Sequence, residues 1–161
     1  MAFRWYGIFG ILLIVFAEVT MFLRIFPFVF WFTPMVWCGY IFLNDAVVYK
    51  LQGSSLLMKS RKKFLKLFIL STIFWWIFEF INNFAKVQGW YYVNLPPSTA
   101  ETLIMGSLSF STILPAVFET WHFIRSLNLF KHADFRIKLS INKLLVSFLF
   151  VVGILFFIIP F

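Results

Sequence analysis

The chain has 161 residues, of which 62% are hydrophobic and 23% aromatic, whereas only 12% are charged. Soluble domains contain about 25% charged residues, so this composition excludes an ordinary water-soluble domain and indicates a membrane protein. The net charge of +8 would favour nucleic acid in a soluble protein, but these basic residues flank apolar runs, so we expect membrane lipids and no nucleic acid as partners.

Five apolar segments follow one another along the chain, at about residues 6–23, 28–48, 67–84, 102–124 and 144–161. Each approaches the roughly 20 residues that a helix needs to cross the bilayer core. Helix is also the structure that pairs every backbone group within the segment. The sequence therefore predicts an all-α fold, a single polytopic transmembrane bundle of about five spans that covers residues 1–161.

The first segment resembles a signal peptide because Arg4 precedes it. Its apolar run is longer than the usual core of about 7–15 residues, and it contains Glu18, so we expect an uncleaved span. Only residues 24–27 separate it from the second segment, which predicts an antiparallel neighbouring pair. The fifth segment ends at Phe161, so we expect either a partner at this end or a natural protein that continues further.

Lysine and arginine residues are concentrated in two connectors. Together with Arg4, residues 50–66 and 125–143 hold 12 of the 14, and only Arg24 and Lys86 fall on the other side. The positive-inside rule then predicts a cytoplasmic N-terminus. In the first connector, apolar residues alternate with basic ones that we expect to contact lipid headgroups: Lys59, Arg61, Lys62 and Lys63.

The loop before the fourth segment carries turn and interface signals. Residues 90–92 are Trp-Tyr-Tyr, which suits the headgroup region, and Pro96-Pro97 precedes Ser98, a predicted helix N-cap. Within the fourth segment, Pro115 predicts a kink.

Ionisable side chains inside a span are costly, so each needs a partner or a water-filled cavity. Helical rise and the predicted topology sort these residues into two depths. We expect an outer layer formed by Glu18, Glu79, Asn82, Asn83 and Glu101, and an inner layer formed by Asn44, Asp45, Glu119 and His122, close to Arg125.

Glu79 is the strongest candidate for chemistry. It follows Trp75 and Trp76, and Asn82 and Asn83 lie one helical turn further on the same face. A desolvated carboxyl group can carry a proton or act as a general acid, with the amides orienting it. The alternative is a structural glutamate that is hydrogen-bonded to Asn82 or to a neighbouring helix.

Glu119 and His122 have the Glu-x-x-His spacing of di-iron bundles, but such sites need two pairs and two further glutamates. We therefore predict no metal site, and we keep His122 as a candidate cofactor ligand, for example to a tetrapyrrole. The simpler interpretation makes Glu119 a polar tie beside Arg125, with Glu18 and Asp45 also structural.

Several stretches together resemble an uncharacterised family of prokaryotic polytopic membrane proteins: GYIFLNDAVVYK, GSSLL, FWWIFEFIN, GWYY and SFSTILPAVFET. The resemblance covers about residues 39–120 and implies the cytoplasmic (inner) membrane of a prokaryote. A fainter likeness to lycopene cyclase domains rests on Asp45, Glu79 and Gly89-Trp90-Tyr91. Residues 96–101 lack the paired acidic residues of those domains.

Three functional hypotheses follow. The first is a non-enzymatic accessory or scaffold subunit of a larger membrane complex, favoured by the absence of a soluble domain. The second is a membrane-embedded, cyclase-like enzyme that acts on a lipid or isoprenoid through Glu79. The third is a small proton-coupled transporter, which the lack of an inverted repeat disfavours. The sequence identifies no cofactor and no oligomeric state.

Overall fold

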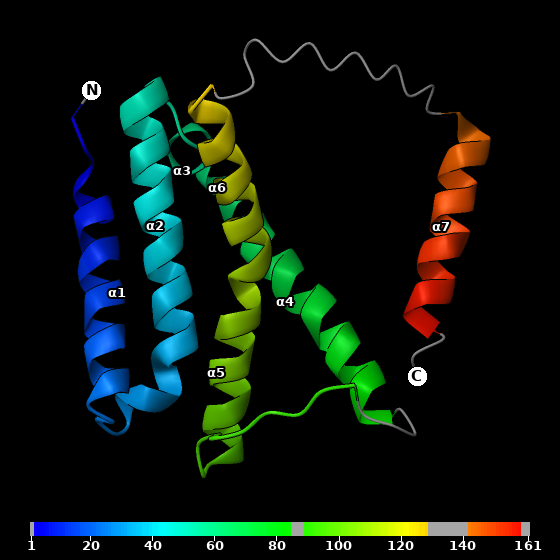
Figure 1. Ribbon diagram of the computed structural model, residues 1–161, viewed down its shortest axis with the longest axis horizontal. Coiled ribbons are helices and arrows are strands. Elements are labelled where there is room, and N and C mark those ends of the chain that lie inside the picture. Colours follow the sequence, from blue (N-terminus) through cyan, green and yellow to red (C-terminus); the bar gives the residue numbers. More distant parts are fainter. Residues whose placement is uncertain (1, 85–88, 129–141, 159–161) are drawn as a thin grey trace.

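The computed structural model describes residues 2–84, 89–128 and 142–158 (Figure 1). Within these ranges the chain forms helices and no strand, so the prediction of an all-α fold is confirmed. The elements are α1 (Trp5–Phe22), η1 (Phe28–Trp31), α2 (Phe32–Gln52), α3 (Leu56–Lys59), α4 (Arg61–Phe84), α5 (Thr99–Ser111), α6 (Ile113–Ser126) and α7 (Lys143–Ile158). Part of the predicted pattern lies outside the described residues, namely Lys86, Lys131, Arg136, Lys138 and the last residues of the fifth segment.

Three of the described helices are long and apolar enough to cross a membrane. They are α1, α4 and the continuous pair α5–α6, which covers Thr99–Ser126. Helix α2 has 21 residues, but Asn44 and Asp45 lower its hydropathy, and α7 is a shorter apolar helix. A membrane crossing by α2 and by α7 therefore stays a prediction.

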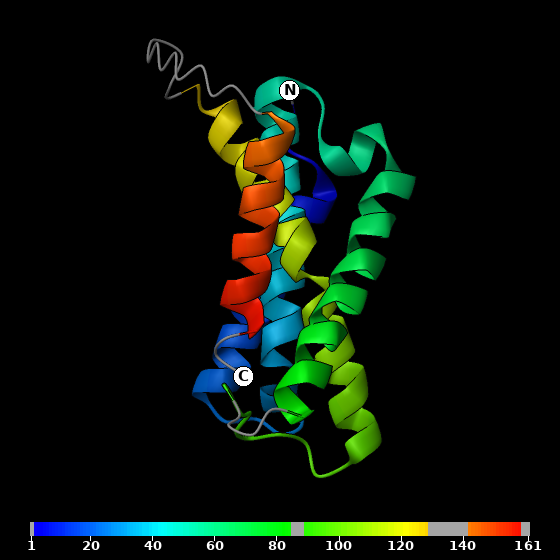
Figure 2. The same cartoon turned by 90° about the vertical axis from the view of Figure 1, so that its right-hand side faces the viewer.

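The long helices run between two ends of the molecule (Figures 1 and 2). The basic end holds the N-terminus, the C-terminal ends of α2 and α6, and α3. The loop end, opposite to it, holds η1 and residues 89–98. Helices α1 and α4 run from the basic end to the loop end, whereas α2 and α5–α6 run the other way, and Figure 1 shows α7 apart from the other helices.

Helices α1 and α2 form an antiparallel pair whose backbones touch, as the short connector predicts. A Cβ atom on Gly10 would lie 2.6 Å from the carbonyl oxygen of Gly39, and one on Gly39 would lie 2.7 Å from that of Gly10. One turn away, a Cβ atom on Gly7 would collide with the Cβ of Ala46. Only glycine fits positions 10 and 39, so these residues set the distance between the two helices.

The fourth predicted segment forms two helices that meet at Thr112. Ser98 is the N-cap of α5, where its hydroxyl accepts a hydrogen bond of 3.5 Å from the amide of Glu101, as the sequence predicts. The break comes three residues before Pro115, which has no amide hydrogen to continue the helix. The predicted kink is therefore present, and the structure shows what stabilises it.

Ser71 of α4 bridges the break between α5 and α6. Its hydroxyl donates to the carbonyl oxygen of Phe110 and accepts a hydrogen bond of 3.0 Å from the amide of Leu114. Phe110 and Leu114 are four residues apart, so the serine hydroxyl stands between two groups that would bond directly in an unbroken helix. One side chain on α4 thus satisfies both sides of the break.

We expect Ser71→Ala to lower the free energy of unfolding in detergent by about 1–3 kcal/mol, because it leaves a buried carbonyl and a buried amide without their partner. Thermal unfolding followed by tryptophan fluorescence measures the change. Thr72→Val is the matched control, since the Thr72 hydroxyl donates to Phe68 in its own helix at 3.0 Å and reaches the Ser107 carbonyl of α5 only at 3.5 Å. Equal stability of Ser71→Ala and wild type would contradict this role.

Helix α4 begins at Arg61, six residues earlier than the apolar segment predicts. The basic residues Arg61, Lys62 and Lys63 therefore occupy its first turn, where they are exposed at the basic end. Long basic side chains lie along a helix and extend toward water, so they do not end it. From there α4 crosses α6 and moves away from α5 toward the loop end (Figure 1).

Candidate functional site

A cavity of about 610 Å³ lies where α4 diverges from α5 at the loop end. Helix α2 closes a third side, and residues of the 89–98 loop cover it. Its wall is mainly apolar, with a few polar groups at the loop end. The residues that line it include Trp37, Trp75, Trp76, Glu79, Asn83, Tyr92, Thr102, Gly106 and Ile113. We call it the loop-end cavity.

Glu79 is a buried carboxyl group held by two aromatic side chains of the loop. The indole Nε1 of Trp90 donates to its Oε1 at 2.8 Å, and the hydroxyl of Tyr92 donates to the same oxygen. Both donors fix the side chain through Oε1, which leaves Oε2 as the oxygen that can face the cavity. The arrangement is that of an oriented acidic group at one end of an apolar cavity.

Tyr92 keeps its proton in this arrangement. Burial and the hydrogen bond to Glu79 raise the pKa of Tyr92 to about 12. Ionisation would remove the donor and place a phenolate oxygen against the Glu79 oxygen that it bonds. The phenol therefore remains a hydrogen-bond donor throughout the neutral pH range.

The structure separates the two asparagines that were predicted to assist Glu79. The Asn82 amide bonds to the loop backbone: its Oδ1 accepts from Gly89 N at 2.9 Å and from Trp90 N at 3.3 Å, and its Nδ2 donates to the Trp90 carbonyl at 2.9 Å. Asn83 instead lines the cavity. Asn82 thus holds the loop over the site, whereas Asn83 and Glu79 are the amide and the carboxyl group that reach the cavity.

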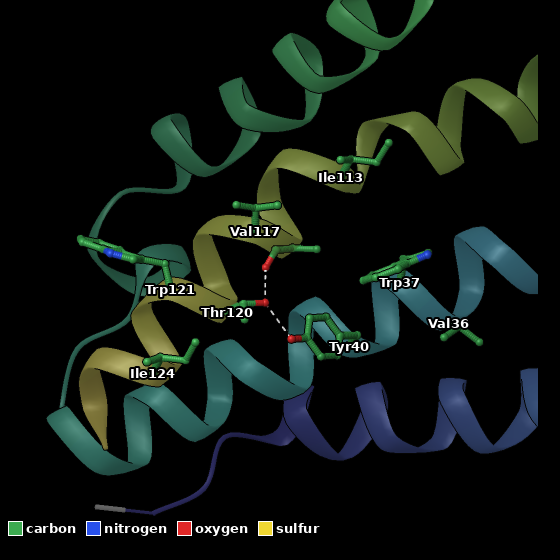
Figure 3. Close-up of a pocket in the computed structure, with 9 residues that line it drawn as sticks. Val36, Trp37, Tyr40, Ile113, Val117, Thr120, Trp121 and Ile124 are labelled. Atoms are coloured by element: carbon green, nitrogen blue, oxygen red, sulfur yellow. Dashed lines mark hydrogen bonds between the residues drawn. The ribbon is translucent and has the colours of Figure 1, made fainter. Parts of the chain in front are cut away.

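A second cavity of about 640 Å³ continues along α6 toward the basic end (Figure 3). Its wall is formed by Val36, Trp37, Tyr40, Ile113, Ala116, Val117, Thr120, Trp121 and Ile124. The two cavities meet at Trp37 and Ile113, which line both. Together they form what we call the apolar groove, with the carboxyl group of Glu79 at its loop end.

The polar groups at the other end of the groove bond to each other. The Thr120 hydroxyl donates to the Ala116 carbonyl at 2.7 Å, so in its 2.7 Å bond with Tyr40 the tyrosine is the donor (Figure 3). This bond ties α6 to α2. The sequence did not predict Trp37, Tyr40 and Thr120 as site residues, because aromatic and threonine residues are common in apolar helices. Only the packing of α2 on α6 brings them together.

The basic end contains a separate buried polar cluster around Asp45, which is 0% exposed. Its Oδ1 accepts from the Tyr6 hydroxyl at 2.7 Å and from the Ser55 hydroxyl at 2.8 Å, and its Oδ2 accepts from the amide of Leu57 at 2.9 Å. These donors come from α1, the α2–α3 turn and α3. Asp45 therefore joins three elements to α2 at this end.

Glu119 lies at the same end, as the predicted inner layer requires. It is 0% exposed, and neither of its carboxyl oxygens has a hydrogen-bond donor among the described residues. Asp45 is the carboxyl group with which it interacts electrostatically. Arg125 instead places its guanidinium over the Trp121 ring, 4.7 Å from the centroid.

The remaining predicted residues lie at the surface or near it. His122 is half-buried, with its ring 4.8 Å from that of Trp121, and the described residues contain no group of three or more His, Cys, Asp and Glu that could hold a metal ion. Glu101 accepts a hydrogen bond of 3.0 Å from the Trp31 indole. Glu18 is exposed on α1, and Lys59, Arg61, Lys62 and Lys63 are exposed at the basic end.

No protein-family model, curated protein or solved structure matches this chain.

Proposed function

We propose that this chain is an integral membrane protein that binds a lipid or isoprenoid in the apolar groove, with Glu79 as the acidic group at the polar or reacting end of the ligand. The observation that carries the proposal is the pair of cavities that meet at Trp37 and Ile113. Each has the size of a small-molecule site, and the combined wall is apolar except near its ends.

The location that we propose is the cytoplasmic membrane of a prokaryote, with the basic end in the cytoplasm. The three membrane-length helices and the exposed lysine and arginine side chains at one end support this orientation. Glu79 then lies near the opposite face. An amphiphile that enters sideways from the bilayer can place its chain along α6 and its polar end beside Glu79 and Asn83.

Glu79 has the features of a positioned acid. Its Oε1 is fixed by Trp90 and Tyr92, and the Glu79 side chain is only 6% exposed. A carboxyl group in such a site can donate a hydrogen bond or a proton to a hydroxyl or an olefin of the ligand. This chemistry supports the second of the three hypotheses, in which the ligand is also the substrate.

Quenching of tryptophan fluorescence by a phospholipid with a brominated acyl chain, or by a brominated isoprenoid alcohol, tests the groove. Trp37, Trp75 and Trp76 line it, so we expect quenching that saturates with the probe. Ile113→Trp fills the junction of the two cavities and should abolish the saturable component. Ile104→Trp is the control, because Ile104 is 56% exposed on the neighbouring α5 and lies outside the lining.

Glu79→Gln keeps the size of the side chain but removes its charge and its acidity. We expect about tenfold weaker binding of the isoprenoid alcohol, which corresponds to about 1.4 kcal/mol, the size of one hydrogen bond. Glu101→Gln at the same end of the molecule should bind normally. If neither probe gave saturable quenching in wild type, the groove would not be a lipid site and the proposal would be wrong.

A second function, an accessory subunit of a membrane complex, is favoured by Glu18. This carboxylate is exposed on α1 beside exposed apolar side chains, of which Val15 is 53%, Val19 47% and Phe22 87% exposed. A charge on a lipid-facing surface is costly, and a basic or hydrogen-bonding residue on the helix of another membrane protein would offset that cost. Native mass spectrometry of wild type and Glu18→Leu tests it: a co-purifying subunit that is lost in the variant supports a complex, and a wild-type monomer contradicts it.

A further inference from the structure

Asp45 has one hydrogen-bonding position left. A carboxylate offers about four lone-pair positions, two on each oxygen. The Tyr6 and Ser55 hydroxyls occupy both positions of Oδ1, and the amide of Leu57 occupies one position of Oδ2. All three partners are donors, so Asp45 is the acceptor in each of these hydrogen bonds. The vacant position on Oδ2 can accept one more hydrogen.

Glu119 is the neighbour that can supply that hydrogen. Its side chain is fully buried on α6, which packs against α2, and it interacts electrostatically with Asp45. Its oxygens receive no donor from the described residues. A buried carboxylate without a donor costs several kcal/mol. A protonated Glu119 avoids this cost, because its hydroxyl becomes the donor that completes Asp45.

The basic residues nearby are directed elsewhere. Arg4 bonds the Tyr49 hydroxyl and lies over that ring, 4.1 Å from the centroid. Arg125 lies over the Trp121 ring. The half-buried His122 interacts electrostatically with Arg125, Asp45 and Lys59. Lys59 itself is exposed on α3. From α1, α2, α3, α4 and α6, no described basic group forms an ion pair with Glu119. The Nε of Arg4 and the Nδ2 of Asn44 are also buried without a partner, and neither bonds Glu119. A proton is therefore the positive charge best placed to neutralise Glu119.

We propose that Asp45 and Glu119 form a proton-binding pair that holds one proton between α2 and α6. With the proton present, Glu119 donates to Oδ2 of Asp45 and closes a network that joins α1, α2, α3 and α6. Loss of the proton leaves two adjacent buried negative charges, which repel and push α6 away from α2. Because α6 forms one wall of the apolar groove, proton binding at this pair also sets the width of the groove at its basic end.

Infrared spectroscopy of the detergent-solubilised full chain tests the pair. Wild type at neutral pH should show the carbonyl band of a protonated carboxylic acid, shifted in D₂O, and Glu119→Gln should lose it. Glu101→Gln, which alters a carboxyl group outside the pair, should keep it. The comparison is made in a Glu79→Gln background, so that a protonated Glu79 cannot supply the band. In that background, a spectrum without the band, or a Glu119→Gln spectrum that retains it, would overturn the proposal.

The pH dependence of thermal stability gives a second measurement that does not depend on the band. In Glu119→Gln the new side-chain amide donates to Asp45 at every pH, so this variant should fold and should lose less stability than wild type as the pH rises into the alkaline range. Wild type should loosen with rising pH and should be insensitive to sodium or potassium. A wild type stabilised by one of these cations at constant ionic strength, and not by protons, would identify a cation site instead and overturn the proposal.

Discussion

Replacing Gly10 by alanine is expected to lower the free energy of unfolding in detergent by about 3 kcal/mol, at the upper end of the usual cost of overpacking. The added Cβ would lie 2.6 Å from the backbone oxygen of Gly39 and 2.9 Å from the amide nitrogen of Leu43. Backbone atoms cannot rotate out of the way, so α1 and α2 must separate. Thermal unfolding in detergent measures the change.

Two other glycines provide matched controls for Gly10→Ala. A Cβ on Gly106 of α5 would meet only the Phe110 ring at 3.9 Å, and one on Gly153 of α7 would meet nothing within 4 Å. Alanine at either position gains helix propensity, about 1 kcal/mol at most, so we expect equal or higher stability. A Gly10→Ala variant as stable as the Gly106→Ala variant would show that the backbone contact does not hold the pair together.

Asp45→Ala is expected to lower the free energy of unfolding in detergent by about 3–5 kcal/mol, at least as much as Gly10→Ala. The substitution leaves two hydroxyls and one amide without an acceptor and releases α1 and α3 from α2 together. Circular dichroism during heating, and proteolysis of the α2–α3 turn by trypsin, measure the two consequences. Lys50 and Lys59 flank that turn, and a released α3 should be cleaved faster.

Ser55→Ala separates the role of Asp45 from that of a single donor. It removes one hydroxyl and the N-cap of α3, so we expect a smaller loss of about 1–2 kcal/mol. The stability of Asp45→Asn should lie between those of Asp45→Ala and Ser55→Ala. Its side-chain oxygen can accept from the hydroxyls, but its NH₂ group presents a donor to the amide of Leu57. Equal stability of Asp45→Ala and Ser55→Ala would contradict the view that Asp45 joins several elements.

The existence and order of the helices could be predicted from the sequence, because apolar run length and the need to pair backbone groups in lipid leave little choice. The boundaries were less accurate. Helix α4 extends back to Arg61 because basic side chains do not end a helix at an interface, and the fourth segment divides at Thr112. Pro115 predicts that break. The hydrogen bonds of Ser71 to both sides of the break depend on where α4 crosses, and no local sequence pattern encodes this crossing.

Helical spacing and depth in the membrane made part of the candidate site predictable. The three- and four-residue spacing places Glu79, Asn82 and Asn83 on one face of a helix, and the depth argument places Asp45 and Glu119 at one end. Which side chain meets which depends on tertiary register. Loop closure brings Trp90 to Glu79, and the packing of α6 beside α2 brings Glu119 to Asp45, whereas sequence spacing alone pointed to Arg125.

The break at Thr112 also determines how the chain can adapt to bilayers of different thickness. At about 1.5 Å per residue, the 28 residues of α5–α6 measure about 42 Å, whereas the 18 residues of α1 measure about 27 Å. A hydrocarbon core of about 30 Å matches α1 but is too thin for a straight α5–α6. A rigid rod would have to tilt as a whole, but two halves joined at a serine-bridged break can tilt separately. In the membrane orientation that we propose, bilayer thickness then acts on the angle between α5 and α6, the helices that line the groove.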